Sequence, residues 1–390
     1  SFGRPLWLLG VRSVVSREPL GKVLVLGTWN YPLLLPGVQV AQALAAGNHV
    51  QLKPAAGAEE ASQILVDCFH RSGVPTEQLV LLPSDTSAAT KAIEQGVDLV
   101  VLTGAAETGR IVLQSAAPHL TASIMELSGC DAVIVLPDFD LSRLTNALRF
   151  GLRFNGSATC IGPRRLMVRR SERDSILTRL KLELADEPPI IVHQSARKIV
   201  ADRISAAIAD GAIDLLDRYS EERLRHTGQL HPIVLDQITE GHQIASADIF
   251  APVLSVLTVD DIDHAVRLVN ECPYRLAASI FGPASDAKPL ANRLNVGTVT
   301  INDLIAPTAD PRVPFGGRGQ SGFGVTRGRE GLISMTAAKV VSTRRGPLAP
   351  HLLPRTDSDE ERLHGALQIL HSSGLRKKLT GLRRMVRGVK

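Results

Sequence analysis

The chain has 390 residues, of which 44% are hydrophobic and 21% are charged, and its formal net charge is +5. This length and composition predict two or three folded domains and exclude collagen-like and wholly disordered chains. The four cysteines are scattered without a Cys-x-x-Cys pair, which argues against a disulfide framework and a structural zinc site and favours a cytoplasmic protein.

The predicted elements alternate between short β-type runs and helical stretches from about residue 20 onward. Early in the chain, strands are predicted at 22–26, 49–52, 78–82 and 99–102, and helices at 38–46, 59–71 and 88–95. After Glu126, strands are predicted at 132–135, 165–168, 252–259, 277–281 and 298–301, with helices at 141–153 and from residue 171. Strands separated by such helices are typical of βαβ units, so we expect parallel sheets covered by helices on both faces.

The C-terminal end has a composition of its own. Residues 346–354 are a proline-punctuated linker, and the last twenty residues hold seven Lys or Arg and no acid, which leaves the preceding 370 residues with a net charge of −2. Five apolar residues of this tail are spaced by four and three, as on one face of a helix: Leu375, Leu379, Leu382, Val386 and Val389. Such a basic amphipathic helix binds an anionic membrane surface or a partner, but a flexible solvated tail is the favoured interpretation.

Several common functional motifs are absent from the sequence. No G-x-G-x-x-G opens a helix after a strand, and the P-loop spacing between Gly104 and Gly109 lacks the lysine that should follow it. No His-x-x-x-His pair and no cluster of acids predicts a metal site. Three tyrosines and nine phenylalanines give no stacking platform for single-stranded nucleic acid, so no nucleic-acid partner is expected.

Short turns of small residues follow several of the predicted strands, at the edge where open α/β sheets bind ligands. They read Gly-Thr-Trp-Asn-Tyr-Pro at 27–32, Leu-Lys-Pro at 52–54, Leu-Thr-Gly at 102–104, Met-Glu-Leu-Ser-Gly at 125–129, Ala-Thr-Cys-Ile-Gly-Pro at 158–163 and Pro-Phe-Gly-Gly at 314–317. In order and spacing these turns resemble the aldehyde dehydrogenase superfamily over residues 17–345. The first turn is most similar to the shorter branch of that superfamily, which acts on fatty and aromatic aldehydes.

The resemblance implies two doubly wound α/β domains and a small oligomerisation element. A Rossmann-like cofactor domain is expected over residues 17–125 with return segments at 316–345, and a catalytic thiol domain over 126–315. Residues 1–16 are then an N-terminal remnant and a candidate oligomerisation strand, and 346–390 are a linker and basic amphipathic tail. A homodimer or a higher homo-oligomer is expected.

Three residues match the catalytic positions of the superfamily. Oxidation of an aldehyde by loss of hydride needs a prior tetrahedral adduct, which a thiolate forms well, and the resemblance gives this role to Cys160. It makes Asn30 the oxyanion donor and Glu126 the general base that activates water against the resulting thioester. Outside these motifs, Cys160 alone would be interpreted as a buried cysteine packed as a small hydrophobe.

The resemblance also implies NAD or NADP as the cofactor. The residues that match the family's cofactor-binding positions are Trp29, Lys53, Thr103, Gly104, Gly109, Leu127, Asp248 and Phe250. Lys53 corresponds to the lysine that binds the adenosine ribose. Ala56 stands where many NAD-preferring members carry a glutamate, so a 2′-phosphate is repelled less and NADP becomes plausible.

Some positions depart from the family pattern. Ala105 replaces a serine, Ala158 replaces a glutamine, Asp248 replaces a glutamate, and Ser128 stands within a segment that usually reads Glu-Leu-Gly-Gly-Lys. None of these changes removes the nucleophile, the oxyanion donor or the base. They leave two alternatives open: a degenerate member that acts as a binding or scaffold module, and a relative that transfers the acyl group instead of hydrolysing it.

Overall fold

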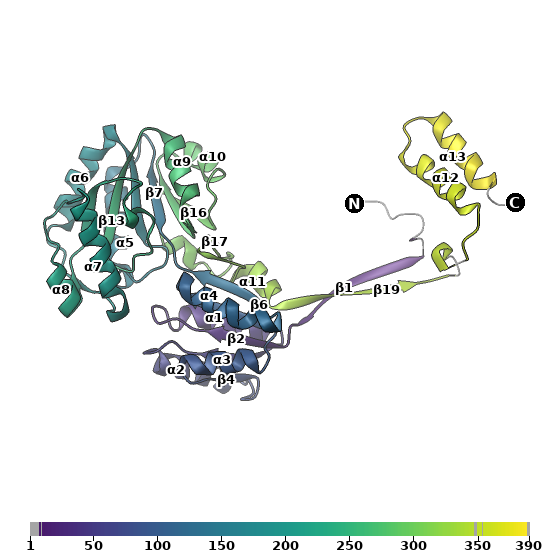
Figure 1. The fold of residues 1–390 in the computed structure, drawn as a ribbon, viewed down its shortest axis with the longest axis horizontal. Helices are drawn as coiled ribbons and strands as arrows, with labels where there is room; N and C mark the ends of the chain where they lie inside the picture. The colour runs from purple at the N-terminus through teal and green to yellow at the C-terminus, as the bar shows by residue number, and fades with distance from the viewer. Residues whose placement is uncertain (1–7, 9, 347–348, 353, 388–390) are drawn as a thin grey trace. The chain divides into compact units, whose positions relative to one another are not determined.

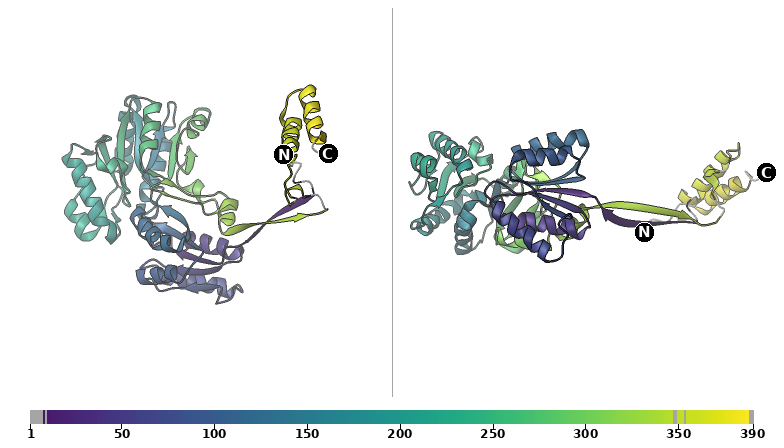
Figure 2. Two further views of the ribbon diagram at one scale, coloured as in Figure 1. Left: turned by 45° about the vertical axis from the view of Figure 1, so that its right-hand side comes forward. Right: turned by 90° about the horizontal axis from the view of Figure 1, so that it is seen from below.

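The computed structural model describes residues 8, 10–346, 349–352 and 354–387. The chain divides into two compact units, one of residues 17–337 and one of residues 1–16 with 338–390. The larger unit contains two parallel-stranded sheets with helices on both sides (Figures 1 and 2). The predicted α/β class is therefore confirmed.

The first sheet of the larger unit has six strands in the order β18-β6-β5-β2-β3-β4. Their bounds are β2 Lys22–Leu26, β3 His49–Lys53, β4 Leu79–Leu81, β5 Leu99–Gly104, β6 Ala122–Leu127 and β18 Gly322–Phe323. All neighbouring pairs are parallel except β18 with β6. The carboxyl ends of β2, β3, β5 and β6 consequently meet at one edge, where parallel sheets bind ligands.

Two layers of helices bury the faces of this sheet. The helices are α1 Leu34–Ala45, α2 Glu59–Arg71, α3 Thr86–Glu94, α4 Ala106–Ala116 and α11 Gly328–Ser334. Val40 of α1 and Val66 of α2 pack with alternate strand residues on one face, and Ile93 of α3 and Val112 of α4 pack on the other. Strands buried on both faces explain the nearly continuous apolar runs of the sequence.

The second sheet has seven strands in the order β10-β12-β13-β8-β7-β15-β16, all parallel except β10. The strands are β7 Asp131–Val135, β8 Pro163–Arg169, β10 Ile213–Asp214, β12 Ile233–Ile238, β13 Val253–Val259, β15 Ala277–Phe281 and β16 Thr298–Ile301. The covering helices are α5 Leu141–Arg153, α6 Arg170–Leu184, α7 Gln194–Ala209, α8 Glu221–Thr227, α9 Ile262–Glu271 and α10 Ala284–Ala291. Helices α5 and α6 cover one face and α7 to α10 the other.

Short elements join the larger ones. They are the strand pairs β9 Ile190–Ile191 with β11 Gln229–Leu230 and β14 Tyr274–Arg275 with β17 Arg318–Gly319, and the 3-10 turns η2 Ala117–His119, η3 Phe154–Ser157, η4 Gln243–Ser246, η5 Ala306–Ala309 and η6 Pro350–Leu352. Among these, η3 matters most for the site, because it leads directly into Cys160.

The smaller unit is built from a β-ribbon and a helical hairpin. Strands β1 (Val11–Pro19) and β19 (Thr336–Arg344) form the ribbon, whose ends run into the larger unit, and α12 (Asp359–His371) packs on α13 (Leu375–Arg387). The two helices cross at Gly365 and Gly381, where an added Cβ on Gly365 would lie 2.6 Å from the Gly381 carbonyl oxygen. In the described residues, no helix is long and apolar enough to cross a membrane.

Several predictions need correction at the chain ends. The predicted return segment 316–345 is shorter, because β19 pairs with β1 and places residues from 338 onward in the smaller unit. The tail predicted as flexible is helical over α13, which packs on α12 through the close approach of Gly381 and Gly365, and the sequence did not predict α12. Val389 and Lys390, and parts of the predicted remnant and linker, lie outside the described residues.

Candidate active site

A cavity lies at the carboxyl edge of the six-stranded sheet and is lined from both sheets of the larger unit. The predicted residues that line it are Trp29, Asn30, Thr103, Gly104, Glu126, Leu127, Cys160, Asp248 and Phe250. These residues are far apart in the chain, and the shared strand edge brings those from 29 to 127 together. Lys53 and Gly109, predicted with them, do not line the cavity.

Cys160 lies at the end of a strained turn. Asn155, Gly156 and Ser157 have consecutive positive φ values of 51°, 60° and 58°. For an ordinary L-residue such as Ser157 this conformation costs about 1–2 kcal/mol, so surrounding contacts must hold it. Burial, with smaller effects from the nearby acids Asp131, Glu126 and Asp248, raises the pKa of Cys160 to about 12. The thiol is therefore protonated at neutral pH until a base removes its proton.

Asn30 connects the first sheet to the cysteine turn. Its side-chain Nδ2 donates to the carbonyl oxygen of Ala158 at 2.8 Å, and its Oδ1 accepts from the hydroxyl of Thr28 at 2.7 Å. Asn155 Nδ2 donates in turn to the Asn30 carbonyl oxygen at 2.9 Å. These bonds hold the Asn30 amide against Ala158, which lies two residues before Cys160 in the chain. In that position the amide can donate an N–H to an oxyanion on the substrate.

Glu126 is buried at the end of β6 and is surrounded by hydrogen-bond donors. Its Oε2 accepts from Gln39 Nε2 at 3.2 Å and from the Thr103 hydroxyl at 3.3 Å, and its Oε1 accepts from the Thr326 hydroxyl. Thr103 lies directly opposite Glu126 in the β5–β6 register. Burial raises the pKa of Glu126, and the Thr326 hydrogen bond and the charge of Arg327 oppose that rise. A buried carboxyl with a raised pKa is a candidate for proton transfer in catalysis.

The residues on the other side of the cavity fit a nicotinamide dinucleotide. Asp248 Oδ1 is buried without a hydrogen-bond partner, so it is an acceptor available to a hydroxyl group of a ligand such as a ribose. Burial raises the pKa of Asp248 to about 6, although a hydrogen bond from Ser128 lowers it. Trp29 stacks on His193 with ring centroids 4.3 Å apart and lies 6.2 Å from Phe250.

The N-terminus of α4 supplies a place for the phosphates of such a cofactor. Gly104 and Ala105 line the cavity and precede α4, and no side chain caps its first N–H groups. Free N–H groups and the helix dipole at this position attract phosphate. Ala105, a departure from the family pattern, thus leaves the helix end open to a ligand.

Lys53 and Gly109 have other surroundings. Lys53 ends β3 at the same sheet edge, where burial lowers its pKa and the charges of Asp85 and Glu59 oppose that effect. A Cβ on Gly109 would lie 3.0 Å from Leu127 Cδ1, so Gly109 allows α4 to pack closely on β6. Gly109 therefore acts on the cavity through the position of Leu127.

Several residues of the site were not predicted from the sequence. Gln39 and Thr326 reach Glu126 from positions 87 and 200 residues away, and His193 stacks on Trp29 from the residue that precedes α7. No local motif surrounds these residues. As for metals, the described residues contain no group of three or more His, Cys, Asp or Glu that could hold an ion.

Comparison with known proteins identifies relatives of this arrangement. The aldehyde dehydrogenase family model matches residues 5–341. The 4,4′-diapolycopene aldehyde oxidase of Methylomonas sp is 33% identical over 92% of this chain and 69% of its own length.

Solved structures show the same fold. Betaine aldehyde dehydrogenase from Staphylococcus aureus in complex with NAD+ is 26% identical, with a TM-score of 0.81 over 89% of this chain and 72% of its own. NADP-dependent glyceraldehyde-3-phosphate dehydrogenase from Bacillus halodurans complexed with NADP is 28% identical, with a TM-score of 0.79 over 86% of this chain and 71% of its own.

Proposed function

The chain belongs to the aldehyde dehydrogenase family and is an NAD(P)-dependent enzyme that oxidises aldehydes to acids, and on that premise we propose that Cys160, Asn30 and Glu126 carry its reaction. One observation supports this assignment above all. The thiol, the amide donor and the buried carboxyl line one cavity, together with the unpartnered carboxylate oxygen of Asp248.

The first step is attack of the Cys160 sulfur on the aldehyde carbon. The thiol proton passes to Glu126, whose pKa is raised by burial and whose side chain lines the same cavity. The new C–S bond converts the carbonyl into an oxyanion, which the Asn30 amide stabilises. One such donor typically contributes about 2.7–4 kcal/mol to the transition state.

Oxidation and hydrolysis follow on the same sulfur. A nicotinamide cofactor bound in this cavity would supply the acceptor for the hydride that leaves the substrate carbon, and oxidation of that carbon would leave a thioester on Cys160. Glu126 first releases the thiol proton to solvent, and as a carboxylate it then takes a proton from water while the water oxygen attacks the thioester carbon. The C–S bond breaks, the thiolate is restored and the carboxylic acid leaves.

The opposite side of the cavity would hold the cofactor. Asp248 would accept hydrogen bonds from a ribose, Trp29 and Phe250 would provide aromatic walls, and the uncapped N-terminus of α4 would bind phosphate. Both NAD and NADP are compatible with these residues. The solved relatives in complex with NAD+ and with NADP agree with this range.

The substrate is proposed to be an apolar aldehyde. Tyr31 and Phe154 have ring centroids 6.5 Å apart, Phe150 lies 4.8 Å from Phe154, and Leu33 and Leu34 are half-exposed at the start of α1. Because Tyr31 shares a hydrogen bond of 2.7 Å with Thr159, this apolar surface adjoins the cysteine turn. The Methylomonas relative is named as a 4,4′-diapolycopene aldehyde oxidase.

The test is reduced-cofactor formation at 340 nm with a series of aldehydes of increasing chain length, run with NAD+ and NADP+ separately. We expect turnover that rises with chain length and is abolished in Cys160→Ala, while cofactor binding measured by calorimetry persists. Cys68→Ser, which changes an exposed cysteine far from these motifs, is the matched control and should keep its activity. Turnover by Cys160→Ala would refute the mechanism.

The same proposal includes a homo-oligomer. Among the residues that the structure describes, the ribbon consists of β1 and β19 alone, and it exposes Val14, Val15, Val340 and Val341. An isolated two-stranded ribbon with apolar side chains is marginally stable in water, so a second copy is expected to cover it. Light scattering of the purified protein should give at least a dimer, and Val15→Lys with Val340→Lys should give a monomer. A monomeric wild type would refute the proposal.

The chain is proposed to work in the cytoplasm, where free cysteines are maintained, and to contact anionic membranes through α13. Leu375, Leu379, Leu382 and Val386 are all more than half exposed, and α13 carries basic residues and no acid. The protein should therefore sediment with phosphatidylglycerol vesicles and not with neutral phosphatidylcholine vesicles. Leu379→Glu with Leu382→Glu should abolish sedimentation. Equal binding to both vesicles, or to neither, would contradict this contact.

A further inference from the structure

Arg164 is a buried cation directly behind the cysteine turn. Its side chain is 3% exposed, and it lies on β8 four residues after Cys160. Its Nη1 donates to the Ser157 hydroxyl at 3.0 Å, and its Nη2 donates to the carbonyl oxygens of Ser157 at 2.9 Å and Thr159 at 3.0 Å. Three of its hydrogen bonds thus hold the segment that immediately precedes the nucleophile.

The segment that it holds is the strained part of the site. Ser157 is the only residue of the positive-φ run 155–157 that is neither glycine nor asparagine, and Arg164 bonds both its hydroxyl and its carbonyl oxygen. Gly162 provides the space for the guanidinium, because an added Cβ there would lie 2.9 Å from Arg164 Nη2. The turn and the arginine therefore fit each other closely.

Arg164 also reaches the cofactor side of the cavity. Its Nη1 donates to the carbonyl oxygen of Ala251 at 2.9 Å, in the segment that carries Asp248 and Phe250. Burial lowers the pKa of Arg164, while the charges of Asp248 and Asp131 oppose that effect. The guanidinium remains charged, since arginine does not lose its proton in proteins. One side chain thus joins the nucleophile turn to the segment that faces the cofactor.

We propose that Arg164 is a positioning residue that fixes the Cys160 turn and the 248–251 segment against each other, so that sulfur and cofactor face the same cavity. The inference rests on the proposed roles of Cys160 and Asp248. Arg164 does not line the cavity, and it acts through the carbonyl groups that it binds.

The reactivity of the Cys160 thiol can test this role, because charged groups from several elements surround the sulfur. The charged or titratable groups around Cys160 are Asp131, Glu126, Asp248, Arg164, Arg327 and Tyr31. Two of these are cations, so the loss of one should make the thiolate harder to form. An alkylation rate reports the thiolate directly and needs no turnover.

The experiment measures iodoacetamide alkylation of Cys160 against pH, by mass spectrometry of its peptide in a Cys68→Ser background. In Arg164→Met we expect the midpoint to rise and the rate at pH 8 to fall about tenfold, which corresponds to one pKa unit. In Arg164→Lys, which keeps a charge and part of the donor set, the shift should be smaller. The KM for the cofactor should rise in both variants, because the 248–251 segment loses its anchor.

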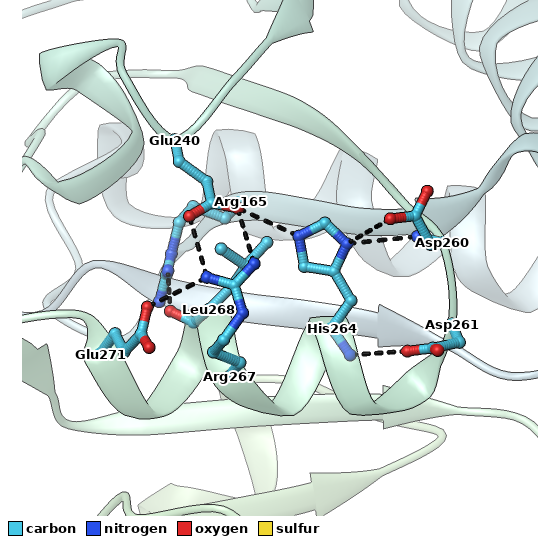
Figure 3. Close-up of polar contacts among 8 residues, drawn as sticks. All are labelled: Arg165, Glu240, Asp260, Asp261, His264, Arg267, Leu268 and Glu271. Atoms are coloured by element: carbon cyan, nitrogen blue, oxygen red, sulfur yellow. Dashed lines mark hydrogen bonds and ion pairs between the residues drawn. The ribbon is translucent and has the colours of Figure 1, made fainter.

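Arg165 is the matched control. It is the next residue of β8 and equally buried, but it points to the opposite face, as successive strand residues do. It donates to the carbonyl oxygen of Cys130 at 3.0 Å and to that of Leu268 at 3.0 Å, and Figure 3 shows the bond to Leu268. Arg165→Met should lower stability as Arg164→Met does and leave the alkylation midpoint unchanged. An equal shift in the two variants would overturn the proposal.

A second variant keeps the proposal testable if Arg164→Met does not fold. Gly162→Ala retains the guanidinium and displaces it from the turn, so it should slow alkylation in the same direction. If folded Gly162→Ala and Arg164→Lys alkylate at the wild-type rate and keep the wild-type KM for the cofactor, the proposed role of Arg164 is refuted. That result would leave the proposed reaction intact, whereas turnover by Cys160→Ala would refute the reaction itself.

Discussion

Two clusters of ionisable side chains in the larger unit have opposite electrostatic characters. On the surface, Glu240 accepts from Arg267 at 2.9 and 3.0 Å and contacts His264 at 3.1 Å (Figure 3). The hydrogen bonds from Arg267 and His264 lower the pKa of Glu240 to about 2. In the cavity, burial instead raises the pKa values of Glu126 and Cys160.

The difference shows what each cluster can do. The carboxylate of Glu240 is paired and exposed to solvent, so it stays charged at every physiological pH. Its role is to hold the start of α9 near residue 240. The cavity groups lose their hydration, so their charged forms are disfavoured and a proton that leaves one group has a neighbouring group to receive it. Both clusters contain a carboxylate and an arginine, and dehydration rather than residue type decides which one supports chemistry.

The largest effect is expected from neutralising the buried base. Glu126→Gln should reduce kcat by roughly 10²–10⁴-fold, because water is no longer deprotonated for attack on the thioester. It should also lower the pH midpoint of Cys160 alkylation, since one anion beside the sulfur is lost. Steady-state kinetics and alkylation in the two proteins check both signs. Glu240→Gln is the surface control, and an equal loss of kcat in that variant would contradict the comparison.

A second prediction concerns Asp248, whose pKa is raised by burial from 3.8 to about 6. A raised carboxyl pKa means that the folded state disfavours the charge, so stability is complete below pH 4 and falls as pH rises through 6. Asp248→Asn should therefore increase the free energy of unfolding at pH 8 by up to about 3 kcal/mol, from the shift of about two pKa units. Urea unfolding at pH 8 and pH 5 checks this, and a gain that does not shrink at pH 5 would contradict it.

A third, smaller effect is expected at Lys53, which is less buried than the ionisable groups of the cavity and more buried than Glu240. Glu59 and Asp85 act on Lys53, so acids surround the position predicted to meet the adenosine ribose. We expect NAD+ to be preferred, and Glu59→Gln to raise kcat/KM for NADP+ relative to NAD+ by about two- to fivefold, as for exposed charges. Glu60→Gln, in the same first turn of α2, is the matched control. An equal change in both variants would show a general charge effect.

The sequence predicted the parts of the site that follow strands directly. Trp29, Thr103 and Glu126 come at or after the ends of β2, β5 and β6, and parallel strands bring such positions to one edge. The periodic patterns also predicted α2, α5, β15 and β16 with their observed bounds. The local sequence pattern predicts the position of each helix and strand because each element must place its own apolar residues in the core.

The partners of those residues were not predictable in the same way. Gln39 and Thr326 reach Glu126 only after distant segments have packed, and a polar residue on a helix gives no sign of its distant acceptor. Arg164 and Arg165 did leave a signal that sequence analysis overlooked. Two adjacent arginines in a strand point to opposite faces, and here Leu166, Met167 and Val168 follow them, so at least one arginine must be satisfied inside.

The smallest effect is expected in the surface cluster itself. The pKa of Glu240 falls from 4.5 to about 2, so its stabilising contribution is present above pH 4.5 and is lost as pH falls toward 2. Because the Arg267 and Glu240 side chains are 46% and 48% exposed, solvent screens the pair, and Glu240→Gln should cost below about 1 kcal/mol at pH 7. Urea unfolding at low salt and in 1 M NaCl checks the reason as well as the size, since salt weakens an exposed pair. A cost that persists in 1 M NaCl would mean that the network acts through packing on α9, and the contrast with the buried site would then rest on geometry rather than on hydration.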